Sequence, residues 1–416
     1  MGLFKKGTAV EEPIKSKDID DGTLLNKEGY YPGVDTDNLM TKKESIWTRE
    51  ISFKKKPSGK KEEKPEKPTS VKLVGIDIGT SCIKVVEGKV KGGKIHISRM
   101  DKIPSPKDIL SDGVIEQVDA VTLAIKSHLK SHGIKTKELA FVSSSSTVIS
   151  RELVVPYVDK EEELKSLVEY EIQQFLCINL NNYEVQFMKI ADVVVDGIEK
   201  QKILSIIYPK GIIESYKDLT TRMILNPYAL DLTNNAVKKV ANLAKFFNAD
   251  LLEKEKTNMF IDLGAKTINI SIVNQGKLDF IRTLPVGGEA IDMFISNNKD
   301  IPLEAAEKLK MEQVDVGRKR EFNEINDGVA MIVDEWVSDI NRIVQFYANK
   351  SSGKQIDYVY LYGGTSKLKG LDDYVENRLR IPTANILTVD NLEFDKDLKI
   401  TTVEEYINAI GALIRL

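Results

Sequence analysis

The ten residues DIGTSCIKVV (Asp77–Val86) recur later in the chain as DLGAKTINIS (Asp262–Ser271). Each copy follows an apolar run, LVGI before the first and NMFI before the second, and each leads into another apolar run. Both copies keep an Asp, an aliphatic residue, a Gly, three variable residues and an Ile in register. A single D-x-G turn would only close a hairpin. Two copies in equivalent settings predict two related lobes that face each other across a cleft.

The repeated motif has residue types that suit a nucleoside triphosphate with Mg²⁺. A glycine turn lets the backbone approach a phosphate closely, and successive N–H groups form a concavity that binds anions. Asp77 and Asp262, each at the end of a strand, would hold Mg²⁺ through water, and Lys84 would add a positive charge for the phosphates. The chain contains neither a G-x-x-x-x-G-K-[ST] loop nor a G-x-G-x-x-G fingerprint, so the common alternative nucleotide motifs are excluded.

A third stretch points to the same kind of site. The sequence DYVYLYGGTSKLKGLDDYVENRL (Asp357–Leu379) reads as a buried strand, a Gly363-Gly364 pair and an amphipathic helix. A strand, a double glycine and a helix provide a place where a flat ring can lie against the backbone. We therefore expect the base of a nucleotide here.

Composition limits the other functions. The 416 residues are 42% hydrophobic, and 60 Lys and Arg against 63 Asp and Glu give a net charge of -3, which disfavours the basic face of a nucleic-acid-binding protein. Cys82 and Cys177 are too few for a disulfide framework and fit a reducing compartment. The chain has no run of 18 or more apolar residues, so no membrane-spanning helix is expected.

The three histidines are expected at the solvent or at the edge of the core. Residues 1–70, which end in a Lys/Glu/Pro linker, are expected to form a disordered tail.

Together the three stretches resemble the actin-like ATPase superfamily, and this resemblance implies which residues contact the nucleotide. Five features of the superfamily have counterparts here. The implied residues are Asp77, Gly79, Thr80, Ser81, Cys82 and Lys84 for the first phosphate loop, and Asp262, Gly264, Ala265 and Thr267 for the second. They are Gly363, Gly364, Thr365 and Lys367 for the adenosine loop, Glu307 and Lys310 for the ribose-contacting helix, and Gly287 and Gly288 for a helix start near the nucleotide.

Within the superfamily, residues 72–416 are most similar to the PilM family of type IV pilus machines, which is related to the division protein FtsA. The resemblance implies an α/β fold of two duplicated ribonuclease-H-like lobes with a small inserted subdomain. The implied boundaries are 71–147 with 203–240 for lobe I, 148–202 for the inserted subdomain, 241–398 for lobe II, and 399–416 for a connecting helix back to lobe I. The helix of the inserted subdomain should bury Leu164, Leu167, Val168, Ile172 and Phe175 on one face.

The family resemblance also implies the function: a cytoplasmic scaffold that binds ATP and Mg²⁺ at the inner face of the cytoplasmic membrane. It would dock the cytoplasmic N-terminal peptide of a PilN-like membrane protein and link it to the motor ATPase components of the pilus; self-association stays open. An FtsA-like filament protein is disfavoured because the chain ends in GALIRL without a basic amphipathic helix. A small-molecule kinase is disfavoured because no carboxylate base has a suitable context. No residue is singled out to position an attacking water, so no catalytic residue is assigned and hydrolysis should be slow at most.

Overall fold

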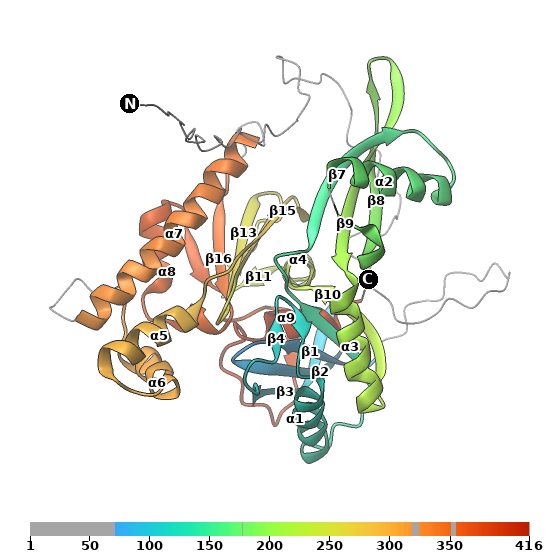
Figure 1. Cartoon of the computed structure of the whole chain (residues 1–416). Helices are drawn as coiled ribbons and strands as arrows, with labels where there is room; N and C mark the ends of the chain where they lie inside the picture. The colour runs from blue at the N-terminus through green and yellow to red at the C-terminus, as the bar shows by residue number, and fades with distance from the viewer. Residues whose placement is uncertain (1–70, 177, 318–323, 351–354, 416) are drawn as a thin grey trace, which may run out of the picture. The chain divides into compact units, whose positions relative to one another are not determined.

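The computed structural model describes residues 71–415 except Cys177, 318–323 and 351–354 (Figure 1). The predicted tail and linker, residues 1–70, therefore lie outside the described residues. Among the residues that are described, no helix combines the length and the apolar character needed to cross a bilayer.

The first phosphate-loop motif belongs to a six-stranded sheet in the order β10-β6-β1-β2-β3-β18. In this sheet β1, β2 and β3 form an antiparallel meander, and β6 and β10 run parallel to β1. The short β18 adds an edge parallel to β3. The strands are β1 (Leu73–Ile78), β2 (Cys82–Lys91), β3 (Lys94–Pro104), β6 (Glu138–Ser143), β10 (Asn226–Leu232) and β18 (Leu392–Phe394).

The second motif belongs to a five-stranded sheet with the same topology, in the order β15-β14-β13-β16-β17. Here β13, β14 and β15 form the meander, and β16 and β17 run parallel to β13. The repeated topology shows that the sequence repeat marks a duplicated fold. The strands are β13 (Thr257–Leu263), β14 (Ile268–Asn274), β15 (Lys277–Leu284), β16 (Tyr358–Tyr362) and β17 (Thr383–Asn385).

Helices cover both sheets, and two of them connect the sheets. Helix α9 packs on β1, β2 and β6 and on α4, while α4 also contacts β14 and β15 of the second sheet. The described helices outside the inserted subdomain are α1 (Val118–Ser131), α3 (Lys210–Met223), α4 (Thr233–Leu243), α5 (Gly288–Lys299), α6 (Leu303–Gln313), α7 (Glu324–Lys350), α8 (Leu371–Leu379) and α9 (Ile407–Leu413). Short elements complete the fold: β4 (Leu110–Ser111), β5 (Val114–Ile115), β11 (Phe246–Phe247), β12 (Asp250–Leu251) and the 3₁₀ turns η3 (Leu180–Asn182) and η4 (Gly364–Lys367).

The inserted subdomain is a three-stranded antiparallel sheet, β7-β9-β8, covered by α2 (Figure 1). Its elements are β7 (Ile149–Pro156), α2 (Glu161–Phe175), β8 (Tyr183–Val195) and β9 (Ile198–Pro209). Leu164, Val168 and Ile172 of α2 pack in a small core with residues of β7 and β9, as predicted. The prediction for Phe175 was wrong: its side chain is 52% exposed, and the Arg151 guanidinium lies 4.8 Å from its ring centre.

Strand β9 belongs to two cores at once because successive side chains of a strand point to opposite faces. Ile203 and Ile207 face the core under α2, while Leu204, Ile206 and Tyr208 join the core of the first sheet. The predicted boundary after residue 202 falls inside this strand. The inserted subdomain is therefore fixed to the first lobe by a continuous, buried strand.

Candidate nucleotide site

The two D-x-G loops have the same backbone geometry. Asp77 is paired across the hairpin with Lys84, and Asp262 with Asn269, which is the equivalent position of the second copy. In the first loop the Gly79 N–H donates to the Cys82 carbonyl at 3.1 Å; in the second the Gly264 N–H donates to the residue three positions on, at 3.0 Å. The sequence repeat thus produces two matching turns, one at the end of β1 and one at the end of β13.

Both turns require glycine because the backbone folds back on itself. A Cβ at Gly79 would lie 2.8 Å from the Cys82 carbonyl oxygen, and a Cβ at Gly264 would lie 2.8 Å from the Thr267 carbonyl oxygen. Contacts of this length are too short for carbon and oxygen, so the glycines allow a turn that other residues would open. Thr80 and Ser81 complete the first turn, with Ser81 exposed.

The two predicted metal-binding carboxylates are buried near each other. Asp77 and Asp262 are 8% and 7% exposed. Burial raises the pKa of Asp262 most, and the negative charge of Asp77 raises it further, to about 6. The hydrogen bond from Asn408 and the positive charge of Lys84 lower it, but by less. The Lys84 amine lies 3.5 Å from an Asp77 oxygen; burial would lower its pKa, but Asp77 and its neighbours raise it, so Lys84 stays charged. Burial raises the pKa of the Cys82 thiol beside them.

The start of α5 and the turn η4 close on the second loop. The Gly264 carbonyl accepts from the Gly288 N–H at 3.0 Å and from the Thr365 hydroxyl at 3.0 Å. The Ala265 carbonyl accepts from the next N–H of α5, Glu289, at 2.9 Å. A Cβ at Gly287 would lie 2.5 Å from the Ala265 carbonyl oxygen, which explains a glycine at this position. The structure therefore brings together the predicted second phosphate loop, the helix start and the adenosine loop.

Gly363 is one of the tightest points of the site. Its φ of 93° lies in the left-handed region that favours glycine, and a Cβ here would overlap Asp262 Oδ1 and lie 2.7 Å from the Leu263 carbonyl oxygen. Its N–H donates to the Glu404 carbonyl at 2.9 Å. A Cβ at Gly364, by contrast, would find its nearest heavy atom 3.7 Å away, at Glu405. The double glycine thus combines a position with no room for a side chain and one with open space.

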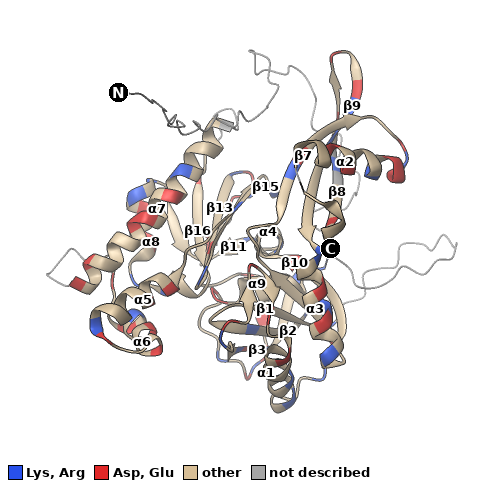
Figure 2. Cartoon of the chain, viewed as in Figure 1, with Lys and Arg blue, Asp and Glu red and all other residues tan. Residues whose placement is uncertain are grey.

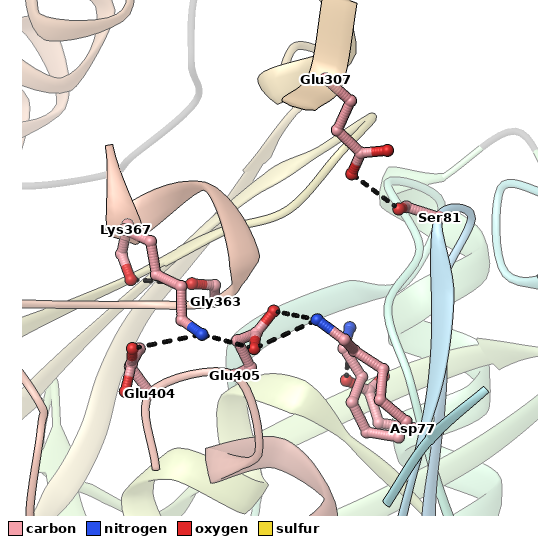
Figure 3. Close-up of polar contacts among 10 residues, drawn as sticks. Asp77, Ser81, Glu307, Gly363, Lys367, Glu404 and Glu405 are labelled. Atoms are coloured by element: carbon pink, nitrogen blue, oxygen red, sulfur yellow. Dashed lines mark hydrogen bonds and ion pairs between the residues drawn. The ribbon is translucent and has the colours of Figure 1, made fainter. Parts of the chain in front are cut away.

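Both predicted residues of the ribose helix, α6, contact the site: Glu307 contacts the first loop and Lys310 contacts the start of α5. The Ser81 hydroxyl donates to Glu307 Oε1 at 3.4 Å, which joins α6 to the first loop (Figure 3). Lys310 is 5% exposed and its amine donates to Asp292 at 2.8 Å and to the Gly288 carbonyl at 3.3 Å. In this structure Lys310 holds α6 against the start of α5 and is already fully engaged there.

Three polar residues of the site were missed by sequence reasoning: Lys102, Glu405 and Asn408. Glu405 lies between the two lobes: it accepts from Lys102 of β3 at 3.0 Å and from Lys367 of η4 at 2.7 Å (Figure 3). Burial would raise the pKa of Glu405, but these two hydrogen bonds lower it. Asn408, in the first turn of α9, donates to Asp262 Oδ2 at 2.9 Å. Two adjacent glutamates, Glu404 and Glu405, inside the predicted connecting segment 399–416 and just before α9 were the local signal that could have drawn attention to it.

The donor set fits a hydrated Mg²⁺ ion. Mg²⁺ in nucleotide sites is held by one or two carboxylates together with waters and phosphate oxygens. Asp77 and Asp262 supply two buried carboxylates whose negative charges repel each other even though Lys84 lies beside Asp77. In addition, Asn408 Oδ1 is buried and has no hydrogen-bond partner among the described residues, so it could accept from a metal-bound water. When bound, Mg²⁺ would neutralise phosphate charge at this point.

Comparison with known proteins identifies related chains. The family model described as type IV pilus assembly protein PilM matches residues 75–414. A solved structure described as a PilM–PilN type IV pilus biogenesis complex is similar to this chain with a TM-score of 0.70, at 20% sequence identity, over 83% of this chain and 99% of that one. Taken with the family match, this similarity confirms the fold class predicted from the sequence.

Two curated relatives match over shorter stretches. The cell division protein FtsA of Streptococcus pneumoniae is 22% identical over 260 residues, which cover 58% of this chain and 55% of FtsA. The ethanolamine utilization protein EutJ of Salmonella typhimurium is 39% identical over 62 residues, or 15% of this chain and 22% of EutJ. The chain thus spans about half, or less, of the curated relatives it matches.

Proposed function

The chain belongs to the PilM family of type IV pilus assembly proteins, and we propose that it is an ATP-binding scaffold of such a machine. In this proposal it docks the cytoplasmic N-terminal peptide of a PilN-like inner-membrane protein and links that protein to the assembly motor ATPase. It would thus lie at the cytoplasmic face of the membrane through its partners. The matching loops around Asp77 and Asp262 carry the nucleotide part of this proposal.

The nucleotide part follows from what the site offers. The two glycine turns present backbone N–H groups, Lys84 supplies a positive charge for phosphates, and the paired carboxylates suit Mg²⁺. None of the site residues described above is assigned as a general base for an acceptor hydroxyl or for an attacking water. ATP is therefore proposed as a ligand that favours one arrangement of the two lobes over another. The expected effect is a change in partner affinity when ATP binds.

The peptide part rests on the surface of the inserted subdomain. Strand β7 is an edge of its sheet, so one side of its backbone has no neighbouring strand in the described chain. An edge strand can accept an extended peptide as an added strand. Val154, near the C-terminal end of β7, and Tyr157, just after the strand, are 48% and 42% exposed. The first turn of α2 carries three glutamates (Figure 2), which would favour basic side chains in the peptide.

A calorimetric titration tests the docking surface. The full chain is titrated with the cytoplasmic N-terminal peptide of a PilN-like protein, beside the variants Val154→Asp and Ile224→Asp. Val154→Asp places a charge on the edge strand and should weaken binding at least about tenfold, which corresponds to about 1.4 kcal/mol. Ile224 is 83% exposed outside this surface and has a φ of 56°, which Asp tolerates, so its variant is the matched control. Equal affinity for all three proteins would contradict the proposed surface.

A second candidate function is a filament of the FtsA type, which the FtsA similarity supports. Sedimentation of the full chain with and without Mg²⁺-ATP distinguishes the two. The scaffold proposal expects the chain to stay in the supernatant and to bind the peptide. Nucleotide-dependent pelleting together with an absence of peptide binding would favour the filament protein.

A further inference from the structure

A cluster of one carboxylate and two imidazoles lies where α1 packs against β3. Asp101 belongs to β3, His128 to the last turn of α1, and His132 is the residue that caps the C-terminal end of that helix. One ligand atom from each of the three side chains lies within 4.8 Å of the other two. Residues four apart lie on one face of a helix, and this spacing explains why both imidazoles meet Asp101. The chain has only three histidines, and two of them are in this cluster.

Each imidazole has one ring nitrogen with a defined neighbour in or beside the cluster. His128 Nε2 lies 3.3 Å from Asp101 Oδ2, and it is buried without a hydrogen-bond partner among the described residues. His132 Nδ1 lies 3.0 Å from the His128 carbonyl oxygen. The Ser131 hydroxyl lies 3.0 Å from the same Nδ1 and 3.0 Å from the same carbonyl. With this hydroxyl donating to the carbonyl, His132 carries its proton on Nδ1 and keeps the lone pair of Nε2. A backbone carbonyl bonded to the other ring nitrogen is the usual way in which proteins orient a metal-binding histidine.

We propose that Asp101, His128 and His132 form a binding site for one Zn²⁺ ion, separate from the nucleotide site. Two imidazoles and one carboxylate are a donor set typical of zinc, whereas Mg²⁺ and Ca²⁺ prefer oxygen ligands alone. With bonds of about 2.1 Å, the ligand atoms of a tetrahedral zinc site are about 3.4 Å apart, so modest side-chain rotations complete the geometry. The Asp101 side chain is 27% exposed and His132 is exposed, which leaves room for water as a fourth ligand.

The proposed ion would act as a structural clamp. The two imidazole rings stack with centroids 3.9 Å apart at an interplanar angle of 26°, so one ring must turn out of the stack before both bind the same ion. A metal bound to both and to Asp101 would fix the C-terminal end of α1 to β3. Because the ion binds the folded chain, it should raise the unfolding temperature in proportion to the logarithm of its concentration. The alternative for the same residues is a metal-free ion pair between Asp101 and a protonated His128.

The test uses the full chain without a polyhistidine tag, stripped with a chelator and titrated with Co²⁺ and then Zn²⁺. Co²⁺ in a tetrahedral site absorbs visible light, so it reports the ligand geometry directly. We expect one Co²⁺ per chain, its displacement by Zn²⁺, and a higher unfolding temperature with Zn²⁺. His132→Gln should weaken binding by at least about 100-fold, the upper end of the effect of an outer-shell change. Because the His132 side chain is exposed, this variant keeps the fold and is informative where His128→Gln fails to fold.

Two controls separate this site from others in the chain. His96→Gln removes the third histidine, which pairs with Glu393 outside the cluster, and should leave Zn²⁺ binding unchanged. Asp77→Ala removes a carboxylate of the proposed nucleotide site and should also leave it unchanged. Absence of saturable metal binding, or equal affinity in the wild type and His132→Gln, would overturn the proposal and leave the metal-free ion pair.

Discussion

Replacing Asp262 with Asn should stabilise the nucleotide-free chain at neutral pH while it impairs the site. Burial and the charge of Asp77 raise the pKa of Asp262 from 3.8 to about 6, so the ionised form is disfavoured in the folded chain. A raised carboxyl pKa means that the folded chain loses stability as the pH rises from 3.8 through 6. Two pKa units at about 1.4 kcal/mol each give a penalty of about 3 kcal/mol at pH 7.5. The amide of the Asp262→Asn variant cannot ionise and avoids this penalty.

Urea unfolding at two pH values measures the effect. At pH 7.5 the free energy of unfolding of Asp262→Asn should exceed that of the wild type by up to about 3 kcal/mol, and at pH 4.5, where wild-type Asp262 is mostly protonated in the folded chain, by about 1 kcal/mol. The matched control is Asp300→Asn, at an exposed position where both residues tolerate the observed φ of 51°. A gain that does not depend on pH, or no gain at pH 7.5, would refute the reasoning that repulsion and burial act on Asp262.

Two further substitutions test how the lobes meet. Gly363→Ala should lower the free energy of unfolding by about 1–3 kcal/mol more than Gly93→Ala does. Both glycines have a positive φ, but of the two only Gly363 has no room for a Cβ. Equal losses in urea unfolding would contradict the close approach of Gly363 to Asp262 and Leu263. Glu405→Gln should lower stability at pH 7 by about 1 kcal/mol because it removes the charge held by Lys102 and Lys367. The lowered pKa of Glu405 means that this contribution is present above 4.5 and is lost as the pH falls below it, so a difference that persists at pH 3 would speak against the bridge.

The sequence was informative where local chemistry determines the structure. The turn residues between Asp77 and Lys84 specify a hairpin by themselves, and the second copy at Asp262 repeats it in the same register. The apolar residues of α7 likewise recur at helical spacing and lie in the core, as the buried Trp336 and Ile340 show. In each case residues within one or two turns or strands carry the whole signal. The duplicated fold could therefore be inferred from short segments.

The remaining features depend on contacts between distant segments. Lys102 and Glu405 are 303 positions apart, and no local pattern predicts that they form an ion pair. Lys310 matched a ribose-contacting pattern, yet the structure engages its amine with Asp292 because α5 and α6 pack together. Phe175 follows the helical spacing of α2 but is the last residue of the helix, where its ring stays half exposed against Arg151 of β7. Tertiary packing decides these positions.

In the proposed function, the two copies of the D-x-G loop together form one Mg²⁺-dependent ATP site. A calorimetric titration of the full chain with ATP, with Mg²⁺ and with a chelator, tests it directly when repeated for Asp77→Ala and Asp262→Ala. We predict one Mg²⁺-dependent site per wild-type chain and loss of binding in both variants, although they lie in different lobes. Unchanged affinity in either variant would contradict the account.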